Sequence, residues 1–189
     1  MAPKVGILAL QGDFAKHKQA IDQLGIPSLF VRSSAELEQC SHLIIPGGES
    51  TTLLNLIERL QLRQALLSFG RGKAILGTCA GLIILAKQVD HLNFDPLGLI
   101  DITVNRNAYG RQIDSFVDTI NIHLNGKASA FEGVFIRAPK IEALQPPVIA
   151  LGHHRDQVVL AANKHILVAT FHPELANDLR IHQYFLDHF

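Results

Sequence analysis

Ala-Ile-Leu-Gly-Thr-Cys-Ala-Gly-Leu-Ile-Ile-Leu (residues 74–85) is an apolar run that a Gly-Thr-Cys turn divides in two. The first part has the length and composition of a buried strand, and the second has the apolar pattern of a helix. This order predicts a strand, a sharp turn and a helix, with Cys79 at the turn. Gly77 and Gly81 fit this prediction, because a turn packed against its own helix has no room for a Cβ atom.

A cysteine at such a turn corresponds to a nucleophile elbow, in which a strained turn presents a side chain above the end of a sheet. The dipole and the free amides at the start of the following helix would favour the thiolate of Cys79 over the thiol. The alternative interpretation is an inert buried cysteine, which is a common environment for a lone thiol. The spacing alone leaves both interpretations open, so the rest of the chain has to separate them.

The residues before this turn alternate between strand-like and helical patterns. Continuous apolar runs predict strands at residues 4–10, 28–31 and 43–45. Helical spacing is found at Phe14, His17, Ile21 and Leu24, and again at Leu53, Leu56, Ile57 and Leu60. Asp13 is the expected N-cap of the first of these helices. The alternation predicts an α/β fold with a doubly wound, mostly parallel sheet.

The second half of the chain has a different pattern. Short β-like segments separated by polar turns lie at residues 101–104, 114–123, 134–136, 148–151, 158–161 and 166–170. A final helix would place Leu179, His182, Phe185 and Leu186 on one face. We therefore expect antiparallel additions to the sheet. No repeat, low-complexity tract or linker interrupts the chain, which predicts a single domain over residues 1–189.

The composition excludes several classes of protein. The chain has 17 basic and 17 acidic side chains, and this zero formal net charge argues against a nucleic-acid-binding protein. No apolar run reaches membrane-spanning length, and the N-terminus has no basic segment followed by an apolar one. The two cysteines, Cys40 and Cys79, make no disulfide framework, so we expect a cytoplasmic protein.

A thiol nucleophile needs a nearby base and a third group that orients the base. Phe-His-Pro-Glu (residues 171–174) follows an apolar strand, and Pro173 biases His172 toward an extended conformation. In an extended segment His172 and Glu174 point to the same side. Glu174 could then accept a hydrogen bond from one ring nitrogen while the other nitrogen faces Cys79. The alternative is a surface histidine in a strand-to-helix turn.

The remaining histidines show no metal-binding pattern. His153 and His154 are adjacent, and adjacent strand residues face opposite ways, so they are poor joint ligands. The chain has neither a His-Glu-x-x-His spacing nor a second cysteine pair, so we expect no metal site. We expect surface or half-buried positions for His17, His42, His91, His123, His165, His182 and His188.

Pro-Gly-Gly-Glu-Ser-Thr-Thr (residues 46–52) is the third candidate site. The two glycines before a helix would expose successive amide groups, which form a natural site for an oxyanion or a carboxylate. A phosphate-binding loop would need Gly-Lys-Ser or Gly-Lys-Thr, and this loop has no lysine. An oxyanion hole shared between the loop and the amide of Ala80 fits better. The alternative is a plain turn with Ser50 as the helix cap.

Three motifs together resemble the class I, or triad, glutamine amidotransferases: residues 46–51, Gly-Thr-Cys-Ala-Gly at 77–81, and Phe-His-Pro-Glu at 171–174. Three more narrow the resemblance to the glutaminase subunits of pyridoxal 5′-phosphate synthases. These are Leu-Ala-Leu-Gln-Gly-Asp at 8–13, Arg-Asn-Ala-Tyr-Gly-Arg-Gln at 106–112, and Phe-Ile-Arg-Ala-Pro at 135–139. The resemblance extends from Gly6 to the last helix.

The resemblance implies that Cys79 attacks the side-chain amide of L-glutamine and releases ammonia through a glutamyl thioester, with His172 and Glu174 completing the triad and no cofactor. It implies glutamine-binding positions at Gly47, Gly48, Glu49, Arg106, Ile136 and Arg137. An independent chemical reason supports the two arginines, because guanidinium groups suit the α-carboxylate of a free amino acid. Without the resemblance, each arginine would be interpreted as a surface charge.

The resemblance also implies a partner, the synthase subunit that uses the ammonia to make vitamin B6. Gln11 would lie near the docking face as a sensor, and the loop at residues 46–49 could switch. The chain departs from the family pattern at Val117, where an acidic residue is frequent, and at Ala176, where threonine is common. Neither departure is at a proposed site residue.

Two other functions remain as alternatives. One is a γ-glutamyl hydrolase or a cysteine-elbow peptidase-like enzyme, which would keep the fold and change the substrate. Arg106, Arg137 and the loop at residues 46–50 favour free glutamine over a peptide. The other is a non-catalytic regulatory subunit, against which the complete cysteine, histidine and glutamate set speaks.

Overall fold

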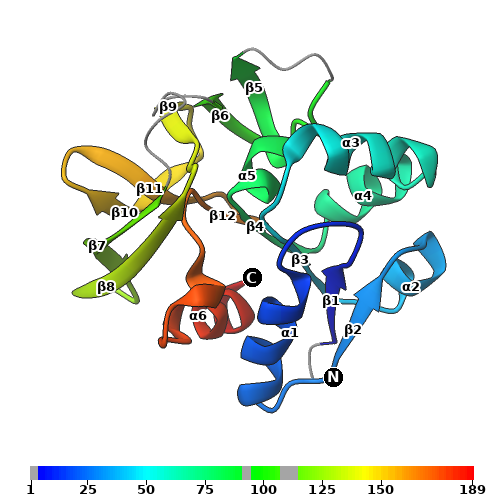
Figure 1. Cartoon of the computed structure of the whole chain (residues 1–189), viewed down its shortest axis with the longest axis horizontal. Coiled ribbons are helices and arrows are strands. Elements are labelled where there is room, and N and C mark those ends of the chain that lie inside the picture. The colour runs from blue at the N-terminus through cyan, green and yellow to red at the C-terminus, as the bar shows by residue number, and fades with distance from the viewer. Residues whose placement is uncertain (1–3, 91–94, 107–114) are drawn as a thin grey trace.

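The computed structural model describes residues 4–90, 95–106 and 115–189. Its main sheet has nine strands in the order β2-β1-β3-β4-β12-β11-β10-β7-β8 (Figure 1). The parallel strands are β1 (Val5–Leu8), β2 (Ser28–Val31), β3 (His42–Ile45), β4 (Ala74–Thr78) and β12 (Ile166–Ala169). The α/β class and the parallel first half of the sheet are therefore confirmed.

The other strands of the main sheet are antiparallel: β7 (Ser115–Leu124), β8 (Lys127–Ile136), β10 (Ile149–His154) and β11 (Gln157–Ala162). The expected antiparallel additions are thus present, but the segment at 166–170 is not one of them. It forms β12, which returns to the middle of the sheet and pairs in parallel with β4.

A separate three-stranded sheet consists of β5 (Ala86–Asp90), β6 (Ile100–Asn105) and β9 (Lys140–Leu144). The strand expected at 101–104 is present as part of β6, but its expected place in the main sheet is wrong. No sequence pattern indicates β5 or β9. Three of the five residues of β5 are polar or charged, Lys87, Gln88 and Asp90, so this strand lacks the apolar run of a buried strand.

Helices cover both faces of the main sheet (Figure 1). One face is covered by α1 (Phe14–Gln23) and α6 (Arg180–His188), and the other by α2 (Ser34–Glu38), α3 (Ser50–Arg59), α4 (Arg63–Gly70) and α5 (Ala80–Leu85). Successive strand residues therefore pack in different layers: Ile44 lies in the core under α1 and α6, and Ile45 in the other core. No helix in the described ranges is both long and apolar enough to cross a membrane.

The pairing of β4 with β12 positions the candidate site. Ala169 lies opposite Thr78 in this parallel register, so the two strands end at the same edge of the sheet. Cys79 follows β4, and His172 follows β12 by three residues. Ligands of open α/β sheets bind at this carboxyl edge. Two segments that are almost a hundred residues apart in the sequence therefore meet here.

Candidate active site

Cys79 lies in the sharp turn that the sequence predicts. Its backbone has φ 49° and ψ −104°, and its N–H donates a 2.9 Å hydrogen bond to the carbonyl of Ala169. A non-glycine residue in such a conformation costs about 1–3 kcal/mol, and such strain is concentrated at functional sites. A Cβ at Gly77 would lie 2.9 Å from the carbonyl oxygen of Gly81, so the expected tight packing of the turn against its own helix is confirmed there. A Cβ at Gly81 would instead overlap the carbonyl oxygen of Ile45 in β3.

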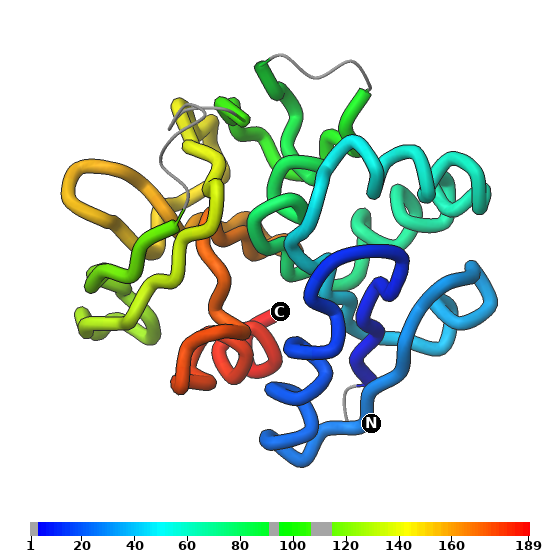
Figure 2. Tube along the Cα trace, viewed as in Figure 1, coloured from blue at the N-terminus to red at the C-terminus, as the bar shows by residue number. Residues whose placement is uncertain are grey.

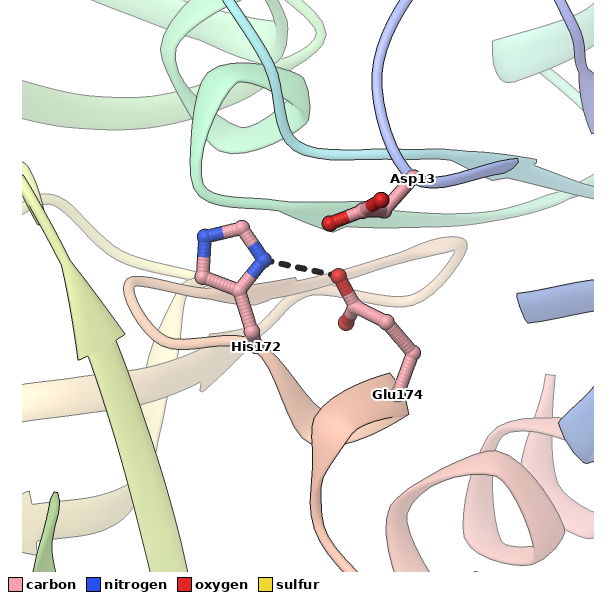
Figure 3. Close-up of side chains that lie close together, drawn as sticks. All are labelled: Asp13, His172 and Glu174. Atoms are coloured by element: carbon pink, nitrogen blue, oxygen red, sulfur yellow. Dashed lines mark hydrogen bonds and ion pairs between the residues drawn. The ribbon is translucent and has the colours of Figure 1, made fainter. Parts of the chain in front are cut away.

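His172 and Glu174 form a buried hydrogen-bonded pair. Nδ1 of His172 donates to Oε1 of Glu174 over 2.7 Å, and the two residues are only 5% and 7% exposed (Figure 3). The expected contact is present, but the expected extended segment is wrong. Glu174 lies in a single 3-10 turn, η1 (Pro173–Leu175), and the backbone N–H of His172 donates to the carbonyl of Val134 at 2.8 Å.

The electrostatics of this pair favour charge separation. Burial by itself lowers the pKa of His172, but the hydrogen bonds and charges of Cys79 and Glu174 raise it to about 10. Burial raises the pKa of Glu174, yet the imidazoles of His17 and His172 lower it to about 2. A protonated imidazole is a proton donor for a departing group. The site can therefore hold a proton donor at neutral pH.

The loop at residues 46–49 lies directly against these groups. A Cβ at Gly47 would overlap the ring of His172 and lie 3.3 Å from Cβ of Cys79, so only backbone fits between them. At Gly48 an added Cβ would overlap the side chain of Gln11. Oε1 of Gln11 accepts a 2.9 Å hydrogen bond from the N–H of Glu49. Gln11 therefore contacts the loop itself.

Glu49 caps α3 and binds Arg106. Its carboxylate accepts hydrogen bonds from the N–H groups of Thr51 and Thr52 at 3.1 and 2.6 Å. Burial raises the pKa of Glu49, but these hydrogen bonds lower it by more, so the pKa lies below its ordinary value. Oε1 of Glu49 also lies 2.7 Å from Nη2 of Arg106. Ser50 is thus not the cap, because the longer side chain of Glu49 reaches both free amides.

The segment after β8 closes the other side of Cys79. The carbonyl of Ile136 accepts a 3.8 Å hydrogen bond from Sγ of Cys79. The next residue, Arg137, is exposed and has φ 41°, a conformation in which the chain turns sharply at the site. Ala80 follows Cys79 as the first residue of α5. Of the motif at residues 106–112, only Arg106 lies within the described residues.

Several polar residues differ from their expected positions. His17, His42 and His182 are 0%, 8% and 0% exposed, so their expected surface or half-buried positions are wrong. The sequence does contain a signal for the burial of His17 and His182, because both lie on the apolar faces of amphipathic helices. Asp13 precedes α1, but its side chain makes no capping hydrogen bond, contrary to expectation. It extends toward His172 and Glu174 instead (Figure 3).

Asp13, His172 and Glu174 are also the residues that could hold a cation. Their ligand atoms lie within 4.8 Å of one another, with Asp13 exposed and the other two buried. His172 and Glu174 already use their facing atoms in a hydrogen bond with each other. This hydrogen bond by itself accounts for the closeness of the two buried groups, and the expectation of no metal site stays a prediction.

Comparison with known proteins points to one family. The model of the SNO glutamine amidotransferase family matches residues 7–189. The pyridoxal 5′-phosphate synthase subunit PdxT of Thermosipho africanus is 44% identical over 185 residues, which cover 97% of both chains. The PdxT subunit of Oenococcus oeni is 42% identical over 186 residues, covering 98% of this chain and 96% of that one.

Solved structures agree at the level of the fold. A crystal structure described as a glutamine amidotransferase superposes with a TM-score of 0.90 at 42% identity, over 97% of each chain. A chain in the structure of PurLQS from Thermotoga maritima reaches a TM-score of 0.71 at 15% identity, over 99% of each chain. The second likeness concerns the fold alone.

Proposed function

This chain belongs to the SNO glutamine amidotransferase family, and from that premise we propose that it hydrolyses L-glutamine to L-glutamate and ammonia through a thioester on Cys79. The observation that supports this proposal most is the buried pair of His172 and Glu174 beside the strained turn of Cys79. Nucleophilic catalysis needs a nucleophile, a base and a group that orients the base, and these three side chains are suited to those roles.

The proposed chemistry starts from a thiolate at Cys79 and a protonated imidazole at His172. The thiolate of Cys79 attacks the side-chain carbonyl carbon of glutamine, so that a C–S bond forms and an oxyanion develops. When the C–N bond breaks, His172 gives its proton to the leaving nitrogen and ammonia departs. Water then attacks the thioester, His172 takes a proton from it, and glutamate leaves. Glu174 holds Nδ1 of His172 throughout.

We propose that the oxyanion is bound by the amide of Ala80 and by an amide of the Gly47-Gly48 loop. Both segments border Cys79, as such a site requires. In this structure the next amide, that of Glu49, is directed at Gln11 instead. The two glycines would let the neighbouring peptides reorient without steric cost.

We propose that glutamine is recognised by its two charged α-substituents. Arg106 and the exposed Arg137 are suited to the α-carboxylate, and the carboxylate of Glu49 is suited to the α-ammonium group. Glu49 and Arg106 already pair with each other, so each is held in place before substrate arrives. Gly47, Gly48 and the carbonyl of Ile136 would form the remaining walls of the glutamine site.

The relatives at 42–44% identity are named as subunits of pyridoxal 5′-phosphate synthase. We propose that this chain likewise supplies ammonia to such a synthase subunit in the cytoplasm, as part of vitamin B6 synthesis. An ordinary peptide is a weaker candidate substrate, because a residue within a peptide chain lacks the free α-groups that Glu49 and Arg106 fit. A γ-glutamyl peptide keeps both α-groups, so the turnover test below is what separates it from free glutamine.

The test combines turnover and labelling of the chain together with its synthase subunit. Cys79→Ser should abolish ammonia release from L-glutamine, and γ-glutamyl peptides should be poor substrates of the wild type. An electrophilic glutamine analogue should label Cys79 and spare Cys40, which is 2% exposed and whose thiol pKa is raised by burial. Turnover that survives in Cys79→Ser, or labelling of Cys40 alone, would contradict the proposal.

A further inference from the structure

Behind the triad lies a second buried pair, formed by two histidines, His17 of α1 and His182 of α6. The first and last helices of the chain run beside each other here (Figure 2). Both histidines are 0% exposed, and Nδ1 of His17 lies 3.0 Å from Nε2 of His182. Two buried imidazoles in an apolar core are costly unless their nitrogens have partners.

The other nitrogen of His17 faces the active site. Nε2 hydrogen-bonds to Oγ1 of Thr78 at 3.1 Å, and Oε2 of Glu174 lies 3.2 Å from the same nitrogen. Within the described residues, Oε2 makes no hydrogen bond of its own, whereas Oε1 of Glu174 holds His172. His17 thus contacts the residue before Cys79 and the free oxygen of the orienting carboxylate.

These contacts select one tautomer of His17. A carboxylate can only accept, so a lone pair on Nε2 would repel Oε2, whereas an Nε2–H group presents its positive end. Nδ1 is then unprotonated and accepts from Nε2–H of His182. Burial lowers the pKa of His17 more than its charged neighbours Glu174 and Asp13 raise it, and the nearby His172 lowers it too. His17 is therefore neutral.

His182 completes the arrangement from the far side. With its Nε2–H donated to His17, its Nδ1 is a bare lone pair, and this atom has no hydrogen-bond partner in the described part of the chain. Burial, together with His17, lowers the pKa of His182 to about 3, although Glu174 raises it. His182 cannot take up a proton near neutral pH. The N–H of His182 therefore stays directed at His17, and the N–H of His17 stays directed at Glu174.

We propose that His17 and His182 are positioning residues for the triad: a neutral pair whose aligned N–H groups face the second oxygen of Glu174 and keep that carboxylate ionised and oriented toward His172. This inference rests on the proposed function, because the triad is what the pair would position. Neither histidine touches the substrate side of Cys79.

A purely structural role would have a different signature. His42 is another buried histidine, 8% exposed, which contacts Ser41, the backbone of Phe189 and the ring of Phe185. It packs against α6, as His17 does, but it contacts no member of the triad. His42→Leu is therefore a matched control for the loss of a buried imidazole.

The kinetic test uses the chain in complex with its synthase subunit. His17→Leu should lower kcat by about 10–100-fold, the usual cost of losing a partner that orients an active-site ligand, with little change in KM. It should also shift the acidic limb of the pH–kcat profile upward, because Glu174 loses the dipole that favours its ionised form. His17→Gln should restore most of kcat, since its amide can donate to the same oxygens.

His42→Leu should lower the melting temperature and leave kcat and the pH profile in place. The proposal is overturned if His17→Leu retains wild-type kcat, if His17→Gln is no better than His17→Leu at equal stability, or if His42→Leu loses as much kcat as His17→Leu.

A second measurement does not depend on turnover. Histidine ¹⁵N shifts of the full chain, assigned with His17→Gln, should show His17 as the neutral Nε2–H tautomer from pH 6 to 8. A protonated His17 or the Nδ1–H tautomer would overturn the proposal. If the wild type releases no ammonia from glutamine while the Nε2–H tautomer is observed, the proposed function fails and the alignment of the pair stands.

Discussion

Glu174 is a carboxylate held away from water, so its charge depends on the groups around it. Its pKa in the folded chain is about 2, against an ordinary value of 4.5, because the neighbouring imidazoles outweigh the effect of burial. The folded state therefore binds this proton less readily than the unfolded state does. The resulting stabilisation is complete above pH 4.5 and is lost as the pH falls toward 2.

We predict that Glu174→Gln removes about 3 kcal/mol of stability at pH 7 and that this difference shrinks as the pH falls from 4.5 to 3. Urea unfolding of both proteins at several pH values measures the difference. Glu38→Gln, which changes an exposed carboxylate, is the control and should keep the pH dependence of the wild type. A difference between Glu174→Gln and wild type that stays constant down to pH 3 would contradict the prediction.

The sequence predicts the proposed triad because characteristic neighbouring residues accompany its members. Cys79 is marked by two flanking glycines, and His172 by the proline that follows it. His17 has no such mark. Its environment depends on α6 packing beside α1, and that arrangement is a property of the tertiary structure. Local patterns could indicate an apolar helix face but could not show which polar groups meet there.

The β4-turn-α5 element depends on a close approach between backbones. Gly81 in α5 leaves no space between this helix and the carbonyl of Ile45 at the end of β3. We predict that Gly81→Ala costs about 1–3 kcal/mol or more, as overpacking of a rigid contact does. It should also lower kcat, because the helix moves Cys79 with it. Thermal unfolding and a glutaminase assay measure the two effects.

Gly72→Ala is the matched control, because a Cβ there has no heavy atom within 4 Å. It should change neither the melting temperature nor kcat appreciably. Equal stability of the two variants would show that α5 can move away from β3 without cost.

Elements with continuous apolar runs are the ones that the sequence predicts, and β2 even has the expected limits, 28–31. The second sheet is different. Its strands are partly exposed, and β6 pairs with β9, which lies much later in the chain. Register between distant strands comes from tertiary packing, which a local pattern does not contain.

At the scale of the whole molecule, the contact of Gln11 with the Gly47-Gly48-Glu49 loop links the N-terminal segment to the proposed oxyanion site. We predict that the synthase subunit raises kcat by about 10²–10³-fold, the value of one oxyanion donor. Gln11→Ala should blunt this rise, because the loop loses the group that holds the amide of Glu49. Ammonia release with and without the synthase measures it.

Gln19→Ala changes an exposed glutamine on α1 and serves as the control, with stimulation equal to that of the wild type. Full activity of the isolated chain, unchanged on adding the synthase, would contradict this prediction.

The place of β12 between β4 and β11 has a consequence for synthesis of the chain. As the ribosome releases residues 1–90, the first four strands can pair, but Cys79 still lacks its proposed base, His172. His172 and Glu174 emerge only after all the antiparallel strands, and β12 must then insert into the centre of the sheet. A nascent chain is therefore unable to consume glutamine until the residues up to Glu174 have been made, and we expect this late, long-range pairing to limit the rate of folding.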